Sequence, residues 1–485
     1  MDGNESANLA DEAPGYTGLL RYARRLWSYL RLTPFDTSTP EGRSRERYRR
    51  VAWTSLAGVA TNGVRVGTTL ISVPLTVSYL GKERFGLWMT ISSVITLLSF
   101  ADLGMGNGLL NAISAAHGRD DRDAARRYVS GAFFMLSGMA LGIGALFAIF
   151  HPITPWPRVF NVTSLLAMKE AGPAMAVFFA CFAVGLPLGV ARSVQVGYQE
   201  GFANHLWAML GALLGLGGLL VAIRLRAGLP WLVLAMSGGP VLALFLNSVV
   251  VFGWTHTALL PRWQAFDWES TSGIFGTGVL FLVLQILTLI GSSSDNLIIA
   301  HALGPSAVAG YAVVFKLFSV TLIAQHFTSP LWPAFGEAMV RKDHAWAHRA
   351  LNRALVFSLA VGVAFAVPLM VLGKWIIAIW VSPDMAPSTS LLIGFAFWVM
   401  VVNYGGVMST FLNSGPLLGR QIGFFSAATA AALLLKFILV RSCNVSGVIW
   451  ATVIGFGVFY VVPSMKLAYG ALRAVEVRAA SADNG

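Results

Sequence analysis

The sequence predicts an all-α integral membrane protein with about twelve transmembrane helices in two six-helix lobes. Of the 485 residues, 56% are hydrophobic and only 12% are charged, which is too little charge to cover a soluble surface. Apolar runs long enough to span a bilayer, about 20 residues each, follow one another from residue 51 to about residue 470. Because backbone in lipid must satisfy its own hydrogen bonds, such runs are expected to be helices.

The expected spans follow from these apolar runs and from the position of charge. They are 52–79, 86–115, 128–150, 172–195, 204–223, 231–254, 273–300, 307–336, 354–380, 388–413, 418–440 and 445–469. Most of the 34 Lys and Arg residues fall in the N-terminal tail and in alternate loops. This asymmetry favours a membrane orientation with both termini in the cytoplasm.

The same pattern predicts the domain organisation. A basic cytoplasmic tail over 1–50 precedes an N-lobe over 51–255, a cytoplasmic linker over 256–271, a C-lobe over 272–470 and a C-terminal tail over 471–485. The net charge of +12 is explained by this topology, so it gives no reason to expect a nucleic-acid partner.

The second half of the chain repeats features of the first half in the same order. Leu80-Gly81 corresponds to Leu303-Gly304, and Asp120 in the following basic loop corresponds to Asp343. Each half contains six spans, so the two halves have the same orientation. Parallel repeats of this kind are related by a pseudo-two-fold axis along the membrane normal, with a cavity between them.

A set of ordered motifs resembles a known family. The motifs are Pro74-Leu75, Leu80-Gly81, Phe85-Gly86-Leu87-Trp88, Asp102-Leu103-Gly104-Met105 and Ala115-Ala116. The chain resembles the Wzx-type polysaccharide flippases of the multidrug/oligosaccharidyl-lipid/polysaccharide exporter superfamily. The resemblance implies a MATE-like fold and a transporter of the bacterial inner membrane rather than an enzyme. It implies alternating-access translocation of an undecaprenyl-diphosphate-linked oligosaccharide for exopolysaccharide, capsule or O-antigen synthesis, alongside a polymerase and export machinery.

Ionisable side chains at membrane depth are costly and usually face a cavity or a partner. Arg65 lies on a polar helical face with Asn62 and Thr69, and Lys316 lies three residues before Ser319. We expect Arg65, Lys316 and Lys436 to bind a diphosphate and the polar side chains to line the cavity. The alternative is a structural pairing with a buried carboxylate, or for Lys436 an ammonium that reaches the outer interface.

Carboxylates and amides in the spans are candidates for gating or ion coupling. These residues are Asp102, Asn107, Asn111, Asp295 and Glu337. A proton or a sodium ion is the expected coupling ion, and no cofactor is expected. The histidines have no close metal-ligand spacing, so no metal site is expected.

Two other functions compete with a lipid-linked oligosaccharide flippase. A cation-coupled drug antiporter of the same superfamily would favour carboxylates and aromatics in its cavity over the cations Arg65 and Lys316. A membrane glycosyltransferase or polymerase needs carboxylates or metal ligands in a sizeable outer loop. The longest such loop, 151–171, has Glu170 as its single carboxylate, which disfavours this reading.

Overall fold

The computed structural model describes residues 31, 33–98, 100–160, 162–380 and 386–482. All regular structure in these residues is helical. The predicted N-terminal tail lies mostly outside the described residues, but its last part, from Pro40, is already the start of the first long helix.

The first half of the chain forms one lobe. Its helices are α2 (Pro40–Leu98), α3 (Met105–Gly118), α4 (Arg122–Phe150), α5 (Trp156–Val159), α6 (Leu165–Gly197), α7 (Gly201–Arg224) and α8 (Leu229–Val250). Short turns of η1 (Val251–Thr255), η2 (Thr257–Leu259) and η3 (Trp263–Ala265) then lead to the second half.

The second half begins with α9, which passes between the lobes. The helices are α9 (Trp268–Leu303), α10 (Pro305–Phe318), η4 (Ser319–Ala324), α11 (Gln325–Thr328), α12 (Leu331–Val340), α13 (His344–Trp380), α14 (Thr389–Leu412), α15 (Leu418–Phe456), η6 (Gly457–Val461) and α16 (Val462–Ala482). The predicted boundary at residue 272 falls inside α9, which contacts α3 and α4 of the first lobe and α15 of the second.

Two of these helices reverse direction within their bounds. The backbone of α2 is non-helical at Gly81, where φ is 74°, and that of α15 at Asn444, where φ is 53°. Among the described residues, nine helical segments are long and apolar enough to cross a membrane, and α15 belongs to a segment, Leu418–Leu472, that contains one of these reversals. The predicted fold class, a MATE-like bundle of two lobes, is confirmed.

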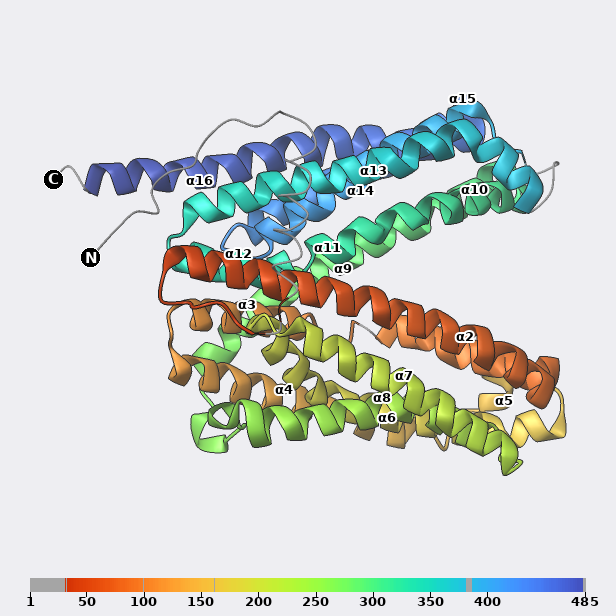
Figure 1. Ribbon diagram of the computed structural model, residues 1–485. Coiled ribbons are helices and arrows are strands. Elements are labelled where there is room, and N and C mark those ends of the chain that lie inside the picture. The colour runs from red at the N-terminus through yellow and green to blue at the C-terminus, as the bar shows by residue number, and fades with distance from the viewer. Residues whose placement is uncertain (1–30, 32, 99, 161, 381–385, 483–485) are drawn as a thin grey trace, which may run out of the picture.

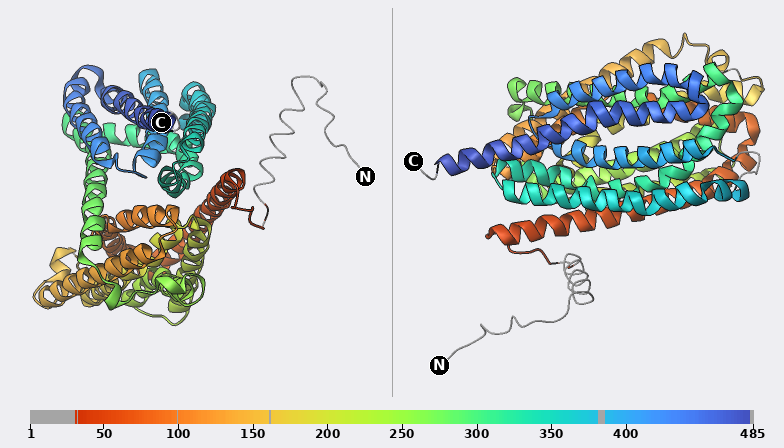
Figure 2. Two further views of the ribbon diagram at one scale, coloured as in Figure 1. Left: turned by 90° about the vertical axis from the view of Figure 1, so that its left-hand side faces the viewer. Right: turned by 90° about the horizontal axis from the view of Figure 1, so that it is seen from above.

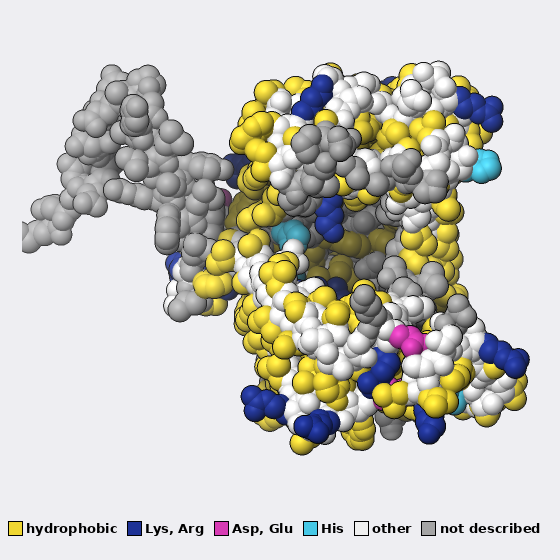
Figure 3. Space-filling model, turned by 90° about the vertical axis from the view of Figure 1, so that its right-hand side faces the viewer, with side chains coloured by type: hydrophobic (Ala, Val, Ile, Leu, Met, Phe, Trp, Pro, Cys, Tyr) yellow, Lys and Arg dark blue, Asp and Glu magenta, His cyan; other side chains and the backbone are white. Residues whose placement is uncertain are grey.

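The lobes meet at one end and separate at the other (Figures 1 and 2). They touch through α3 against α9 and α12, α4 against α9, and α2 against α11. We call the joined end, where α2 begins and α16 ends, the terminal face, and the separated end the open end. Seen from the open end, the molecule is hollowed between the lobes, with basic and histidine side chains inside (Figure 3).

Close backbone packing fixes the contact between α3 and α9. A Cβ atom on Gly104 would lie 2.2 Å from the Gly278 carbonyl oxygen, and one on Gly108 would lie 2.5 Å from that of Ile274. Gly104 also has a φ of 73°, a left-handed conformation that favours glycine. Small residues therefore let helices from both lobes approach each other, as is common in membranes.

The internal repeat is visible in backbone geometry. Gly81 (φ 74°, ψ 172°) and Gly304 (φ 91°, ψ 163°) adopt matching conformations at equivalent turns. The pairing of Asp120 with Asp343 was wrong by one residue. Asp121 caps α4 through the Ala124 amide, as Asp343 accepts from the Trp346 amide at the start of α13. The capping carboxylates are equivalent because both satisfy free amides of a helix N-terminus.

Candidate substrate cavity between the lobes

One face of α2 presents polar side chains to the space between the lobes. Asn62, Arg65 and Thr69 are exposed, and the Asn62 amide nitrogen lies 3.5 Å from Nε2 of His326 in α11 of the other lobe. Thr61, beside this face, is buried and donates to the His205 carbonyl of α7. The predicted polar face of α2 therefore packs against its own lobe on one side and points towards the other lobe on the other side.

A second arginine joins Arg65 in this region. Arg192 of α6 is exposed and lies within electrostatic range of both Arg65 and Asp102. The imidazole of His205 is likewise within range of both guanidinium groups. Neither arginine forms an ion pair with any described residue, so two like charges lie near each other without a neutralising carboxylate in contact.

Arg192 was missed as a site residue because it lies close to the end of the expected span 172–195, and its charge was attributed to the cytoplasmic loop that follows. In the structure α6 continues to Gly197, so Arg192 lies within the helix. The apolar run that continues through Val194 and Val196 was the signal that could have placed it there.

Lys316 and Ser319 lie on the second lobe, where α10 gives way to η4. The Lys316 side chain is exposed and forms no ion pair among the described residues. The Ser319 hydroxyl donates to the Lys316 carbonyl at 2.7 Å. A 3₁₀ segment begins at Ser319, three residues after Lys316, and gives this part of the span a different side-chain spacing from the α-helix before it.

Lys436 does not face the cavity between the lobes, and this prediction needs correction. Its side chain is 1% exposed and forms an ion pair with Asp295 of α9. The ammonium also donates to the Gly291 carbonyl at 2.8 Å and the Ser294 hydroxyl at 3.2 Å. Inside the lobe an unpaired ammonium would be very costly, so the carboxylate holds it where three oxygen atoms satisfy it.

Asp295 is occupied on its other side as well. The Tyr311 hydroxyl of α10 donates to Oδ2 of Asp295 at 2.6 Å. The ion pair therefore joins α9, α10 and α15. Of the two readings considered for such groups, the structural one fits the contacts of Lys436 and Asp295.

Beside this pair lies a cavity of about 310 Å³ within the second lobe. Aromatic side chains form much of its wall, with Asp295 at one side; they are Phe315, Trp398, Phe425, Phe456 and Tyr460. Its carboxylate is already neutralised by Lys436. The cavity therefore offers an apolar ligand space without a free charge.

Asp102 and Asn111 stabilise the start of α3 and its contact with the other lobe. The Asp102 carboxylate accepts from the backbone amides of Gly104 and Gly106. Asn111 donates to the Asn413 carbonyl at 2.6 Å and accepts from the Trp332 indole at 2.8 Å. Asn107, one turn earlier on α3, is partly buried. These contacts fix the positions of Asp102 and Asn111 at the joined end of the cavity.

Glu337 lies at the centre of a polar network that closes the terminal face. Arg47 of α2 donates to both carboxylate oxygens of Glu337, and Gln199 donates to one of them at 2.6 Å. Arg341 donates to Glu337 at 2.9 Å and to Asp120 of the first lobe at 3.0 Å. We call the set formed by Arg47, Asp120, Gln199, Glu337 and Arg341 the terminal seam. Its hydrogen bonds join the two lobes at several points.

Arg47 shows that the predicted basic tail is partly structural. Its side chain is 3% exposed, although the sequence predicts a cytoplasmic tail over 1–50. Its guanidinium pairs with Asp343 at 2.8 Å and lies 4.8 Å from the Trp346 ring centroid. The side chain is buried because α2 begins at Pro40 and its first turns pack against α13.

Next to the seam, Glu46 organises the arginines at the start of α2. Burial would raise the pKa of Glu46, but hydrogen bonds from Arg49, the Phe35 amide and Arg50 lower it to about 2. Arg50 in turn donates to the Tyr198 carbonyl at the end of α6. These charges therefore act as a fixed network at neutral pH.

Within the part of the chain that the structure describes, no three His, Cys, Asp or Glu side chains form a group suited to a metal ion. The site is instead a hollow between two helical lobes, with cations on its walls and a polar seam at its base. This fold and site define a multi-pass membrane transporter.

Comparison with known proteins identifies the family. The sequence profile of the family described as "Polysaccharide biosynthesis protein" matches residues 79–390, well over half of the chain. The chain belongs to this polysaccharide biosynthesis protein family. Its likeness to Wzx-type flippases of the multidrug/oligosaccharidyl-lipid/polysaccharide exporter superfamily is confirmed.

Curated relatives agree with this assignment. A Salmonella typhimurium protein named "Putative O-antigen transporter" is 24% identical over 311 residues, covering 62% of this chain and 68% of the relative. A Salmonella typhi protein of the same name is 23% identical over 316 residues, covering 62% and 67%. These are names of transporters, which confirms the expectation of a transporter rather than an enzyme.

Solved structures support the fold. An outward-facing MATE transporter aligns with a TM-score of 0.74 at 15% identity, covering 88% of this chain and 96% of that chain. A Pyrococcus furiosus transporter of the same superfamily, described as having a binding pocket of reversed polarity, also aligns with a TM-score of 0.74 at 15% identity, covering 89% of this chain and 97% of that chain. At this identity the likeness establishes the MATE-like fold alone.

Proposed function

We propose that this protein moves an undecaprenyl-diphosphate-linked oligosaccharide across the bacterial inner membrane by alternating access. The diphosphate binds the cations of the hollow between the lobes, Arg65, Arg192 and Lys316, while Asn62, Thr69 and Ser319 bind the sugar or water around it. The names of the curated relatives, both O-antigen transporters, support a lipid-linked polysaccharide intermediate as substrate. A polysaccharide polymerase and export machinery are the partners that would use the product.

The observation that carries the proposal is the pair Arg65 and Arg192. Both residues are exposed although surrounding atoms largely desolvate the Arg192 guanidinium, the two lie within electrostatic range of each other, and neither has an ion-pair partner among the described residues. Like charges repel more strongly where surrounding helices lower the dielectric constant. An anionic ligand relieves this repulsion, and two planar guanidinium groups suit a diphosphate.

The terminal face is the cytoplasmic side in this proposal. It holds the first turns of α2 and the basic loops before α4 and α13, which the positive-inside rule favours in the cytoplasm. The hollow then opens to the outer side, and the terminal seam around Glu337 closes the cytoplasmic side. Alternating access requires that this seam opens while the open end closes.

The runner-up is a cation-coupled drug antiporter, and one observation favours it. The cavity of the second lobe is lined by aromatic side chains and reaches the carboxylate of Asp295. However, the buried ammonium of Lys436 already neutralises that carboxylate. The cavity therefore lacks the free negative charge that would select a cationic drug, and the cationic hollow would repel one.

The coupling ion in this proposal is a proton or a sodium ion. Asp102 is a carboxylate that lies within electrostatic range of Arg192. We propose Asp102 rather than the paired Asp295 as the group that senses a coupling ion. Substrate release would then be linked to the charge that Asp102 carries beside Arg192.

Transport in vesicles tests the proposal. Purified protein is reconstituted with a fluorescently labelled undecaprenyl-diphosphate oligosaccharide, and its appearance in the opposite leaflet is measured against time. Wild-type protein should transport it, and Arg65→Ala and Arg192→Ala should lower the rate at least tenfold, with Arg65→Lys retaining part of it. Cation-driven export of a dye without movement of the lipid would reject the flippase and favour the antiporter.

A further inference from the structure

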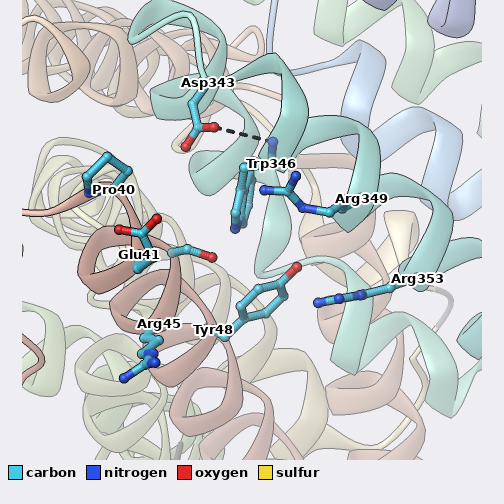
Figure 4. A pocket seen from close by; sticks show the side chains of 9 residues that line it. Pro40, Glu41, Arg45, Tyr48, Asp343, Trp346, Arg349 and Arg353 are labelled. Carbon is cyan, nitrogen blue, oxygen red and sulfur yellow. Dashed lines mark hydrogen bonds between the residues drawn. The ribbon is translucent and has the colours of Figure 1, made fainter. Parts of the chain in front are cut away.

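A small pocket lies on the terminal face between the start of α2 and the start of α13 (Figure 4). Its volume is about 220 Å³, several times the roughly 30 Å³ that one water molecule occupies. Side chains from both lobes line it, including Glu41 and Tyr48 from α2 and Trp346, Arg349 and Arg353 from α13. It lies apart from the hollow between the lobes and has no part in the proposed transport site.

A buried donor without a partner points into this pocket. Trp346 is 1% exposed, and its indole Nε1 has no hydrogen-bond partner among the described residues. In Figure 4 the indole nitrogen is directed into the space between Glu41 and Tyr48. Because an unsatisfied buried N–H group destabilises the protein, an acceptor in the pocket would be bound favourably.

The charged groups around this donor favour an anion. The guanidinium groups of Arg349 and Arg353 turn towards the pocket, whereas Arg45 points away from it (Figure 4). Both arginines are exposed and free of ion pairs among the described residues. Of the two carboxylates present, Asp343 is already paired with Arg47 and caps α13, which leaves Glu41 at the rim.

We propose that this pocket binds a phosphate group, from either an anionic phospholipid headgroup or a soluble phosphate-bearing molecule. The phosphate oxygens accept from the indole N–H of Trp346 and pair with Arg349 and Arg353. Guanidinium groups match phosphate geometry with two parallel hydrogen bonds, and Trp N–H groups only donate. These three donors lie on one face of α13, and the first turns of α2 form the opposite wall of the pocket.

The ligand also joins the two lobes. The donors lie on α13 of the second lobe, and the opposite wall of the pocket is the start of α2 of the first lobe. Bound phosphate therefore strengthens the terminal face in the closed arrangement seen here. This inference is independent of the transported substrate, because its site and its test involve neither Arg65 nor transport.

Thermal stability of the full-length protein in nanodiscs tests the site. Four samples are compared: neutral phosphatidylcholine alone, the same lipid with inorganic phosphate at fixed ionic strength, the same lipid with matched chloride, and phosphatidylcholine mixed with phosphatidylglycerol. A ligand that binds the folded state raises the Tm. The test variants are Arg349→Gln/Arg353→Gln and Trp346→Phe. The control is Arg420→Gln, an exposed arginine at the start of α15 on the same face.

Wild-type protein and the control should gain several degrees in Tm with phosphate or with phosphatidylglycerol, and the arginine double variant should lose that gain. A gain with inorganic phosphate identifies a soluble source, and a gain confined to phosphatidylglycerol identifies a lipid source. Glu41→Gln should increase the gain because it removes the carboxylate at the rim.

The site is refuted if neither phosphate source raises the Tm, or if the double variant responds as wild type does. The double variant alters exposed side chains, so the test does not depend on Trp346→Phe folding well.

Discussion

Arg47 of α2 and Glu337 of α12 form a nearly buried ion pair across the two lobes, with exposed fractions of 3% and 8%. The two residues are 290 positions apart in the sequence. The pair is satisfied by further hydrogen bonds from Gln199 and Arg341, as a buried charge requires. It gives the terminal face a connection that must break whenever the lobes separate there.

Removing one partner of this pair should destabilise the closed terminal face. Glu337→Gln removes the carboxylate that Arg47 and Arg341 share and leaves Arg47 with Asp343 and Arg341 with Asp120, so a loss of up to about 3–5 kcal/mol is expected. Unfolding in denaturant measures the loss, and labelling of a cysteine placed in the seam measures opening. In a double-mutant cycle, Arg47→Met with Glu337→Gln should lose less than the sum of the single variants. Strict additivity would show that the pair does not couple the lobes.

Acid should weaken the network at the start of α2 through Glu46. Its pKa is lowered to about 2 in the folded protein, against an ordinary value of 4.5. A lowered pKa contributes stability that is present above pH 4.5 and is lost as the pH falls towards 2. The Tm difference between wild type and Glu46→Gln should therefore shrink between pH 5 and pH 3. A difference that stays constant over this range would contradict the hydrogen bonds assigned to Glu46.

The pair of Lys436 and Asp295 should support folding rather than substrate binding. Asp295→Asn alone leaves a buried ammonium unpaired and should destabilise the protein by about 3–5 kcal/mol. The double variant Lys436→Met/Asp295→Asn removes both charges and should recover much of this loss. It should also retain transport and its dependence on the ion gradient. Loss of gradient dependence in a stable double variant would return Asp295 to ion coupling.

The close contact of α3 with α9 makes Gly104 intolerant of a side chain. Gly104→Ala places a Cβ atom against the Gly278 carbonyl at a left-handed φ, and a loss of about 1–3 kcal/mol is expected. Gly138→Ala in α4 is the control, because nothing lies within 4 Å of its added Cβ atom. The control should be neutral or slightly stabilising. Equal Tm values for the two variants would contradict the packing described.

The fold could be predicted because an apolar chain in lipid must satisfy its own backbone hydrogen bonds, which restricts it to a few structures such as membrane-spanning helices. Span length identified the helices, and the turns at Gly81 and Gly304 identified the repeat. The one-residue error in pairing Asp120 with Asp343 arose because two adjacent aspartates follow α3 and one is the N-cap. Only geometry distinguishes which carboxylate meets a free amide.

The candidate site was less predictable because the sequence does not show which residue, if any, pairs with a charged side chain in a span. Lys436 and Lys316 look alike in the sequence, yet one pairs with Asp295 and the other is exposed. Arg192 was passed over because it lies near the cytoplasmic end of its span, where its charge was attributed to the adjoining loop. Contacts between residues distant in the sequence, such as Arg47 with Glu337, depend on how the lobes meet.

Binding of a short-chain prenyl diphosphate to the purified protein tests the central claim most directly. Wild-type protein should bind it with an affinity that falls as salt rises. Arg65→Ala and Arg192→Ala should each weaken binding about tenfold, or ~1.4 kcal/mol, and Arg420→Ala should leave it unchanged. Equal affinities for wild type and both cavity variants would contradict the claim that the cations between the lobes bind the diphosphate.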